Sequence, residues 1–526
     1  MTRVALPRLS QSTAIVPRRV CWGHVLISLL LVAGCASGPT PIPPEVSQAG
    51  VAARLQVPPD LNVNPVETVV KPVTPGQASA NPSAVHSLEP EPTIFALADA
   101  IAFALRNSPR LRSGRAAIQR ASGQEQVAFA PFLPQMDLLG QYGVVSGTLA
   151  PGVPGNEGFL LPSGTGTRSY AETEVGLQWT LYDFGRTRGS YRQAVTRECI
   201  AKLQLVRADQ TVEFDVTAAY LDVLLARASR RVQDDAVRRA QATLDDTASR
   251  HKGGVALRED VLRAEVQLSE SREALVVARE GEFDAVARLN NAMGRNAGLP
   301  LEVIDLEARP PLPGALASLL DRAAAQRPEV AVVRQAAAAA EEGRQVARAE
   351  FLPRIFVRAV VGNTEGENVI PGWQEGAGLH LETPLYAGGR HRGELQSAEA
   401  DVEAVLADSQ AILDAVSLQV NLAYRGVMAA SERIDLSRTA VIQAGENLRL
   451  VRVRYRNGDA TPTDIVDSEA ALTRSQQRFF SATYSYLAAL ARLDYALGQH
   501  PGDFAAKVEA SGQEEVPLPR PAPEVR

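Results

Sequence analysis

The sequence predicts a mixed α and β membrane protein whose folded part is a tandem duplication. Three features lead to this prediction: the chain opens with an export signal, several motifs recur at a constant spacing, and alternating strand patterns stand beside unbroken helical stretches. No apolar run reaches the ~18–20 residues that a membrane-spanning helix requires. If the chain crosses a membrane, it must therefore do so with strands.

Composition narrows the class of protein. The chain has 526 residues, 45% of them hydrophobic, so a large core is possible. Its 54 basic and 60 acidic residues give a formal charge of −6, which argues against nucleic acid as a partner. The three cysteines, Cys21, Cys35 and Cys199, are too few for a disulfide-built scaffold or a Cys-rich metal centre.

Residues 1–34 are predicted to be a signal peptide, since Arg18 and Arg19 precede an apolar stretch of suitable length. The Val-Ala-Gly-Cys sequence that ends at Cys35 resembles the lipobox of bacterial lipoproteins. That resemblance implies cleavage before Cys35 and acylation of its thiol and new amine with fatty acids such as palmitate. Ala36, which follows, implies sorting to the outer membrane. The alternative is an ordinary signal peptide with an incidental cysteine.

Proline-rich segments flank the folded part. Residues 35–93 contain a dozen prolines and no sustained hydrophobic period, which predicts a lipidated, extended tether. Residues 501–526 end in a second proline-rich run and are expected to be a disordered tail. Between them lie a first repeat over 94–300 and a second repeat over 301–500.

Three pairs of motifs indicate the duplication. Two pairs are 219 residues apart and the third is 204 apart, and the second offset then holds as far as Gly294 and Gly498. The pairs are Asn107-Ser-Pro-Arg-Leu111 with Gln326-Arg-Pro-Glu-Val330, Phe132-Leu-Pro134 with Phe351-Leu-Pro353, and Leu181-Tyr-Asp-Phe-Gly-Arg-Thr-Arg-Gly189 with Leu385-Tyr-Ala-Gly-Gly-Arg-His-Arg-Gly393. Two copies are too few to bury the faces of a solenoid, so self-association would have to supply the remaining units.

Each copy is expected to run helix, strand pair, long helix, turn, helix. In the first copy, 94–130 is rich in alanine and favours one helix as far as Pro131 and Pro134, which a helix cannot pass. The strands that follow show a period of two, with apolar and polar residues alternating.

The alternating patterns lie at 174–181 and, in the second copy, at 354–361 and 379–382. One face of each predicted strand is apolar and the other is polar, charges included. Two structures fit this pattern. One is an antiparallel sheet that lies on a core with its polar face in water. The other is a membrane barrel whose apolar face meets lipid and whose polar face lines a pore. The export signal favours the barrel.

The longest helices are predicted at 186–252 and 390–456, roughly 100 Å each. In the second, one apolar column consists of Leu413, Val420, Val427, Ile434, Val441 and Leu448. Another column, Ala415, Leu422, Ala429, Leu436 and Leu450, lies roughly 200° around the helix. Two such seams predict a neighbour on each side, as in a ring of helices. An Ala-rich coil in a soluble scaffold is the alternative.

Helix lengths also agree with one another. The helices expected over 94–130 and 257–293 have 37 residues each, about 55 Å, and could lie end to end beside one long helix. The turns at Gly253-Gly254 and Asn457-Gly458 would then lie about 100 Å from the strands.

Taken together, these features resemble the TolC-type outer-membrane channel family over about residues 94–500. The likeness rests on the export signal, the duplicated order of elements, the Phe-Leu-Pro and LYxxGRxRG junctions and the glycine turns. It implies a homotrimer in which each chain gives four strands to a twelve-stranded β-barrel, continued by a twelve-helix periplasmic α-barrel. A lipidated cysteine resembles the drug-efflux branch, although the Gly-Pro-Asp-Tyr motif of that branch is absent.

Asp464 and Asp467 are three residues apart, so on a helix they share one face. Favourable interaction of carboxylates with a helix N-terminus would explain them. The resemblance implies instead that they form rings that constrict the periplasmic mouth and prefer cations. Mutual repulsion in such rings should raise some of the carboxyl pKa values.

The resemblance also implies that the tip of a periplasmic adaptor docks around the turns at Gly254 and Gly458. Asp260 matches a first-turn aspartate that, in the family, is linked to a basic residue on the second turn. Ala460 stands at that second position here, so this link is not expected.

The predicted function is a passive outer-membrane exit duct that extends into the periplasm and works with an adaptor and an inner-membrane pump. No enzyme, metal site or cofactor is expected, because the histidines are scattered and no nucleotide-binding loop or nucleophile elbow occurs. Two alternatives stay open. One is type I protein secretion rather than small-molecule efflux, and the other is a lipid-anchored periplasmic coiled-coil scaffold without a pore.

Overall fold

The computed structural model describes residues 94–149, 164–306, 310–367, 371–500 and 504–507, all within one compact unit. The predicted signal peptide, Cys35 with its tether, and most of the predicted tail lie outside the described residues. The elements follow in the order β1 (Ile94–Phe95), α2 (Leu97–Asn107), α3 (Pro109–Phe129), the 3₁₀ turn η2 (Ala130–Phe132), β2 (Gln135–Leu149), β3 (Gly164–Tyr182), α4 (Arg186–Lys252), α5 (Arg258–Met293), β4 (Glu302–Val303), α6 (Leu316–Gln326), α7 (Pro328–Ala349), β5 (Arg354–Glu367), β6 (Gly372–Glu382), α8 (Arg390–Asn457) and α9 (Pro462–Leu497).

The single helix predicted over 94–130 is wrong in detail. The segment begins with strand β1, and its helical part is broken into α2 and α3 at Ser108. Pro109 explains the break, because proline holds the preceding residue in an extended conformation, and Ser108 has φ −59° and ψ 124°. The second repeat breaks in the same way at Arg327 and Pro328, between α6 and α7. The first motif pair is therefore a helix–helix junction.

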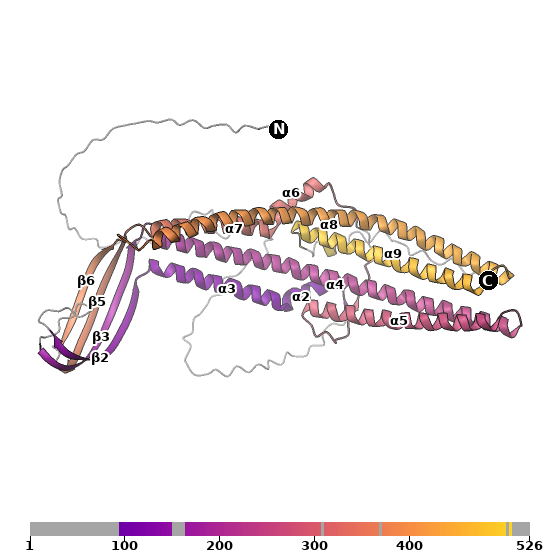
Figure 1. The fold of residues 1–526 in the computed structure, drawn as a ribbon, viewed down its shortest axis with the longest axis horizontal. Coiled ribbons are helices and arrows are strands. Elements are labelled where there is room, and N and C mark those ends of the chain that lie inside the picture. The colour runs from indigo at the N-terminus through magenta and orange to yellow at the C-terminus, as the bar shows by residue number, and fades with distance from the viewer. Residues whose placement is uncertain (1–93, 150–163, 307–309, 368–370, 501–503, 508–526) are drawn as a thin grey trace, which may run out of the picture. The chain divides into compact units, whose positions relative to one another are not determined.

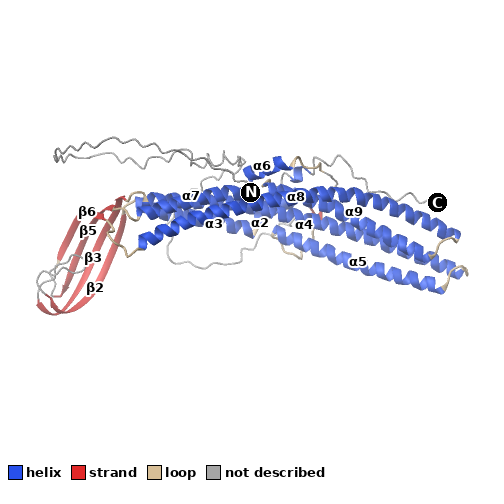
Figure 2. Cartoon of the chain, turned by 45° about the horizontal axis from the view of Figure 1, so that its top comes forward, coloured by secondary structure: helices blue, strands red, loops and turns tan. Residues whose placement is uncertain are grey.

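The predicted strands form one antiparallel sheet of four strands in the order β2-β3-β5-β6, drawn in red in Figure 2. The hairpin β2–β3 comes from the first repeat and the hairpin β5–β6 from the second. Pairing of β3 with β5 joins them. The duplicated hairpins thus extend one sheet, and its outer strands β2 and β6 each have one edge that no described strand covers.

The two long helices have nearly the predicted bounds and organise the rest of the unit. On one side, α2, α3 and α5 pack along α4. On the other side, α7 and α9 pack against both α4 and α8. Figures 1 and 2 show α3 and α5 following one another along α4, and α7 and α9 along α8. The predicted end-to-end arrangement of shorter helices is therefore confirmed.

The main hydrophobic core lies where the two repeats meet. Val216 and Leu224 of α4 are fully buried in one cluster with Val420 and Val427 of α8. The hydroxyl of Tyr220 lies 2.6 Å from the carbonyl oxygen of Ile304 and 3.1 Å from that of Phe95, so it can donate to either. This hydroxyl ties the parallel pair β1–β4, and with it the start of both repeats, to α4.

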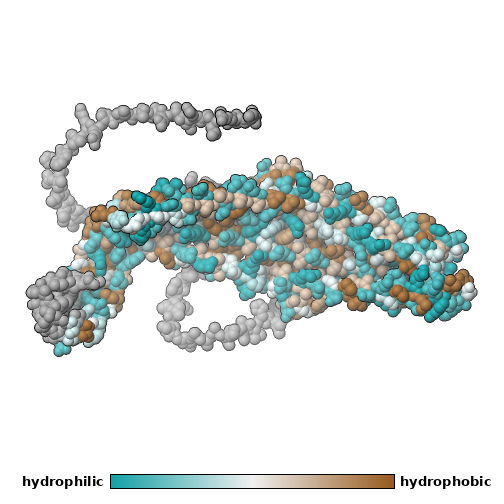
Figure 3. Space-filling model, in the orientation of Figure 1, coloured by the Kyte–Doolittle hydropathy of each residue, from teal (hydrophilic) through white to brown (hydrophobic). Residues whose placement is uncertain are grey.

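The two apolar columns of α8 differ in burial. In the first column, Val420 and Val427 are completely buried, and Leu413 at its start is 38% exposed. The second column is uncovered, with Leu422 61% and Leu436 65% exposed. We call the second column (Ala415, Leu422, Ala429, Leu436, Leu450) the uncovered seam. Figure 3 shows apolar side chains among polar ones on the exposed surface over α8 and α5. One chain therefore supplies a neighbour for only one of the two predicted seams.

Candidate functional site

The helical hairpins α4–α5 and α8–α9 end in glycine turns, at the opposite end of the helices from the sheet (Figure 1). Gly254 and Gly458 have φ values of 76° and 84°. Glycine adopts this left-handed conformation without the steric cost that a Cβ atom imposes. Both predicted turns are confirmed as turns.

Asp464 lies in the first turn of α9 and closes a capping box. The backbone N–H and the hydroxyl of Thr461 each donate to Oδ2 of Asp464 over 2.8 Å, and the N–H of Asp464 donates to Thr461 Oγ1 over 3.3 Å. These hydrogen bonds hold the pKa of the Asp464 carboxyl below its usual range. Within one chain, Asp464 therefore stabilises the helix terminus, while Asp467 is exposed one turn further on.

Asp260 repeats this role in the first hairpin. Its carboxylate accepts a hydrogen bond from the backbone N–H of Leu257 over 3.1 Å at the start of α5. Ala460, which stands where the resemblance implied a basic residue, packs against the small apolar cluster of Val451, Tyr455 and Ile465. In this structure both carboxylates thus cap their own helices.

Other side chains tie the two hairpins together near their tips. The guanidinium of Arg250 lies 4.3 Å from the ring centroid of Tyr455 and donates to the Tyr455 carbonyl oxygen over 3.3 Å. Arg263 of α5 donates to the hydroxyl of Thr463 of α9. These ties were not predicted from the sequence. The available signal was that Arg250 and Tyr455 both lie in the last turns of helices that the duplication makes equivalent.

A small groove of about 240 Å³, lined by polar residues and alanines, runs between α5 and α9 over α4. Arg239 donates to the hydroxyl of Thr473 over 2.8 Å. The buried carboxylate of Glu469 accepts from Thr243 over 3.0 Å and from Arg452 over 2.9 Å. These hydrogen bonds and the ion pair bind α4, α8 and α9 together. Three of the residues that line the groove, Arg239, Glu469 and Thr473, are thus held in place by hydrogen bonds.

The strand register separates the sheet into two chemically different faces. On one face Val175 lies opposite Val361, and Leu177 lies opposite Ala359. The outer strands continue this face with large exposed apolar side chains, including Met136, Leu138, Leu379 and Leu381, which are 67–73% exposed. An exposed apolar surface of this kind is typical of a region that contacts lipid or protein.

The other face of the sheet carries the charges. Arg358 approaches Glu174 to 4.0 Å, and Arg354 pairs with Glu382. Nearby, the amide of Gln141 donates to Glu172 over 2.6 Å. The predicted alternation is thereby confirmed on β3, β5 and β6, and β2, for which no alternation was predicted, continues the two faces.

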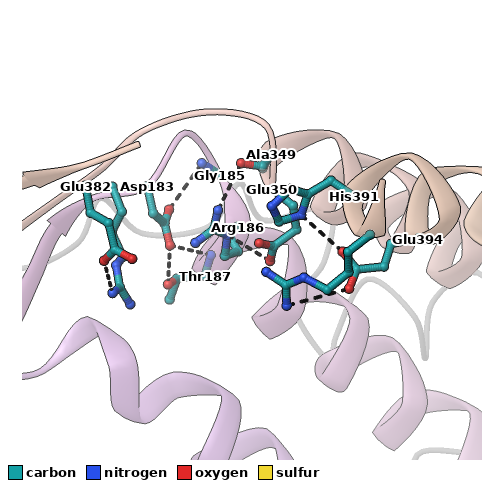
Figure 4. Close-up of polar contacts among 11 residues, drawn as sticks. Asp183, Gly185, Arg186, Thr187, Ala349, Glu350, Glu382, His391 and Glu394 are labelled. Carbon is teal, nitrogen blue, oxygen red and sulfur yellow. Dashed lines mark hydrogen bonds and ion pairs between the residues drawn. The ribbon is translucent and has the colours of Figure 1, made fainter. Parts of the chain in front are cut away.

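The junction between sheet and helices is held by hydrogen bonds and ion pairs (Figure 4). Asp183 accepts from the backbone N–H of Gly185 over 3.2 Å and from that of Thr187 over 2.7 Å. Arg186 donates to the carbonyl oxygen of Ala349 over 3.1 Å and pairs with Glu350 at 3.0 Å. These contacts fix the start of α4 against the end of α7, where the chain enters the sheet.

Two further observations concern the described part of the chain alone. It contains no group of three or more His, Cys, Asp and Glu side chains that could hold a metal ion. None of its helices has an apolar stretch long enough to cross a membrane.

Comparison with known proteins identifies relatives over both repeats. The family model described as outer membrane efflux protein matches residues 100–295 and 319–499. The alkaline protease secretion protein AprF of Pseudomonas aeruginosa is 25% identical over 341 residues, 63% of this chain and 70% of its own. The toluene efflux pump outer membrane protein TtgF of Pseudomonas putida is 26% identical over 352 residues, 64% and 72%. The outer membrane protein TolC of Salmonella enteritidis is 25% identical over 418 residues, 74% and 79%.

Solved structures show the same fold. The outer membrane protein VceC from Vibrio cholerae superposes with a TM-score of 0.66 at 21% identity and covers 77% of this chain and 96% of its own. The outer-membrane channel OprN gives 0.67 at 19% identity, with 76% and 89% covered. Since the two segments that match the family model account for most of the chain and follow its two repeats, the chain belongs to the outer membrane efflux protein family.

Proposed function

We propose that three copies of this chain close into one duct, with a β-barrel in the outer membrane and a tunnel of helices in the periplasm. The protein is an outer-membrane exit duct for export and not an enzyme, as its family is one of efflux proteins. The single observation that carries the closed, multi-copy form is the uncovered seam on α8. Its apolar side chains need a neighbour that one chain does not provide.

The sheet supports the barrel part of the proposal. It has an exposed apolar face, a charged face and two outer strands, β2 and β6, at its edges. Joining β6 of one copy to β2 of the next would cover both edges and close the sheet without free backbone groups. The apolar face would then contact lipid, and the face with Arg358 and Glu174 would line the pore.

The names of the relatives support the proposal that the duct works with other proteins of an export system. Their names span alkaline protease secretion and toluene efflux, so what they have in common is export. We therefore assign the energy source to an inner-membrane pump and the connection to a periplasmic adaptor. The adaptor's docking site is proposed at the hairpin tips around Gly254, Asp260 and Gly458, where the turns are exposed. A scaffold without a pore would leave the two-faced sheet unexplained.

Asp464 and Asp467 are proposed to line the periplasmic mouth of the assembled duct. Both are exposed in one chain, and several copies around an axis would bring their carboxylates together. Such a ring favours cations over anions. Asp464 would then act twice, as helix cap and as part of the constriction, so its substitution must preserve the cap.

The test is conductance in planar lipid bilayers. Wild-type protein is expected to form cation-preferring channels, and Asp464→Asn/Asp467→Asn to lose that preference and pass more current, since asparagine keeps an acceptor oxygen for the cap but no charge. Asp260→Asn, the equivalent cap in the first hairpin, is the matched control and should keep wild-type ion preference. Unchanged ion preference in the double variant would contradict the constriction. A wild-type protein that is soluble without detergent and conducts nothing would contradict the duct.

A further inference from the structure

The break between α6 and α7 buries an arginine. Arg327 stands between the two helices, and its side chain is 1% exposed. Its counterpart at the break between α2 and α3 is Ser108, which carries no charge. A buried guanidinium is costly unless its donors are paired and its charge is compensated. The second repeat therefore needs acceptors and negative charge at a place where the first repeat needs neither.

The described part of the chain supplies acceptors for only one of the three nitrogens of this guanidinium. Nη2 of Arg327 donates to Oε1 of Gln419 over 2.8 Å and to Oε1 of Glu329 over 3.3 Å. Nε and Nη1 are buried and have no hydrogen-bond partner among the described residues. A buried donor without an acceptor is costly, and more so on a charged group. Two nitrogens of Arg327 thus require an acceptor that these residues do not provide.

The charges at this break do not balance. Arg207 of α4 pairs with the same carboxylate, since its Nε lies 2.7 Å from Oε1 of Glu329. Two guanidinium groups therefore share one carboxylate oxygen. Burial is the main cause that lowers the pKa of Arg327, and Arg207 adds to this effect while Glu329 opposes it. One positive charge is left over at a largely buried place.

Other contacts hold Arg207 where it is. Its guanidinium lies 3.7 Å from the ring centroid of Tyr495, and Nη1 donates to the Tyr495 carbonyl oxygen over 3.2 Å. Nη1 also donates to Gln210, whose amide donates to the carbonyl oxygen of Gly498 over 2.6 Å. A Cβ atom at Gly498 would lie only 3.0 Å from Cα of Arg327. The end of α9 thus fixes both arginines beside one another.

The start of α7 adds to the positive potential. No side chain caps this helix at Arg327, and Pro328 supplies no N–H at its first position. The positive end of the helix dipole favours negative charge there. The side chain of Glu329 is 30% exposed, so ions from solvent reach the edge of the site. A water molecule would satisfy Nε and Nη1 of Arg327 but leave the excess charge, whereas an anion would answer both needs.

We infer that the break between α6 and α7 binds chloride or a similarly small monovalent anion, held by Nε or Nη1 of Arg327 beside Arg207. The anion accepts a hydrogen bond that the described chain leaves unmet and neutralises the excess charge. This inference goes beyond the proposed duct and does not depend on it, because every group involved belongs to one chain. Anion binding then stabilises the packing of α7 against α4.

The test is thermal unfolding of the full chain in detergent, in sodium chloride and in sodium gluconate of equal ionic strength. Wild type should be more stable in chloride, with a saturable dependence, because a ligand that binds only the folded state stabilises it. Arg327→Gln should lose this dependence. Arg110→Gln is the matched control and should keep it, since Arg110, the counterpart of Glu329, pairs with Asp215 at the surface.

A second variant separates anion binding from a structural role. Glu329→Gln removes the competing carboxylate, so the chloride concentration at half-effect should fall about tenfold. If the three side chains served only as an ion-pair network, both variants would lose stability equally in chloride and in gluconate.

Crystals grown in bromide locate the ion directly. An anomalous diffraction peak is expected within hydrogen-bond distance of Nε or Nη1 of Arg327, and it should be absent from Arg327→Gln. Equal stability of wild type in chloride and gluconate, or a water molecule at this position in the bromide crystals, would overturn the inference. A peak that persists in Arg327→Gln would be an adventitious ion only and would overturn it as well.

Discussion

At the scale of single residues, the two repeats cap the start of their long helices in different ways. Asp183 caps α4 through the N–H groups of Gly185 and Thr187. Its counterpart before α8 is Ala387, which has no side-chain acceptor. The backbone turn is nevertheless the same, since the N–H of Arg390 donates to the Ala387 carbonyl oxygen over 3.0 Å. One helix start is therefore capped by a carboxylate, and the other relies on its backbone alone.

This difference predicts opposite effects of reciprocal substitutions. Asp183→Ala should destabilise the junction by about 1 kcal/mol, because it removes the acceptor of helix-terminal N–H groups. Ala387→Asp should stabilise the second junction, since the same backbone turn presents equivalent donors. Thermal unfolding of the detergent-extracted protein, followed by circular dichroism, measures both. If both variants shifted the unfolding temperature equally and in the same direction, the helix cap would not be the cause of the change in stability.

At the scale of elements, the middle of α4 buries charge as well as apolar surface. Asp209 and Glu213 lie one turn apart, with Arg115 of α3 and His500 beyond α9 facing them. His500 Nδ1 lies 3.7 Å from Glu213 Oε2. Burial, and then repulsion by Glu213, raise the pKa of Asp209 to about 6, while Arg115 and His500 act in the opposite direction. The packing of α4 is thereby coupled to pH.

The direction of that coupling can be tested with Asp209→Asn. Because the pKa is raised in the folded state, the wild type loses stability as pH rises through about 6, and regains it on acidification. The variant should therefore be more stable than wild type at pH 8, by about 1 kcal/mol after allowance for partial exposure, and lose this advantage near pH 4. Thermal unfolding across this range measures it, with Asp245→Asn, an exposed carboxylate of α4, as control. A constant difference at every pH would contradict the assignment.

At the scale of the whole molecule, the described repeats account for the duct but not for the segment that precedes them. We propose that residues 1–34 are removed on export and that Cys35 then carries fatty acids, with 35–93 as the tether to the repeats. A lipid would hold the chain at one leaflet without carrying it across the membrane. Anchoring and pore formation would thus belong to separate parts of the chain.

The lipid proposal predicts the outcome of metabolic labelling with palmitate. Wild-type protein should incorporate the label and Cys35→Ala should not, because the acylated thiol and the amine exposed by cleavage both belong to this residue. Cys21→Ala, within the predicted signal peptide, is the matched control and should label normally. Label retained in the Cys35→Ala variant, or absent from the wild type, would show that the cysteine is incidental.

Much of the fold could be predicted because its signals are local. Long stretches without helix-breaking residues predict α4 and α8 to within a residue, and Gly254 and Gly458 mark the turns. A local signal was also overlooked, since Pro109 breaks the first predicted helix at Ser108. The sheet order could not be predicted in this way, because the pairing of β3 with β5 joins residues 173 to 198 positions apart.

By itself, the sequence determined the duplication, the lengths of the two long helices, the two-faced strands and the resemblance to an export family. These follow from periodicity and from proline and glycine, which act over a few residues. Only the tertiary structure decided which seam of α8 is covered, that Asp464 caps its own helix, and that Arg250 meets Tyr455. Such contacts depend on how distant helices pack, and a repeating pattern that is the same on both sides of a helix does not say which side its own chain will bury.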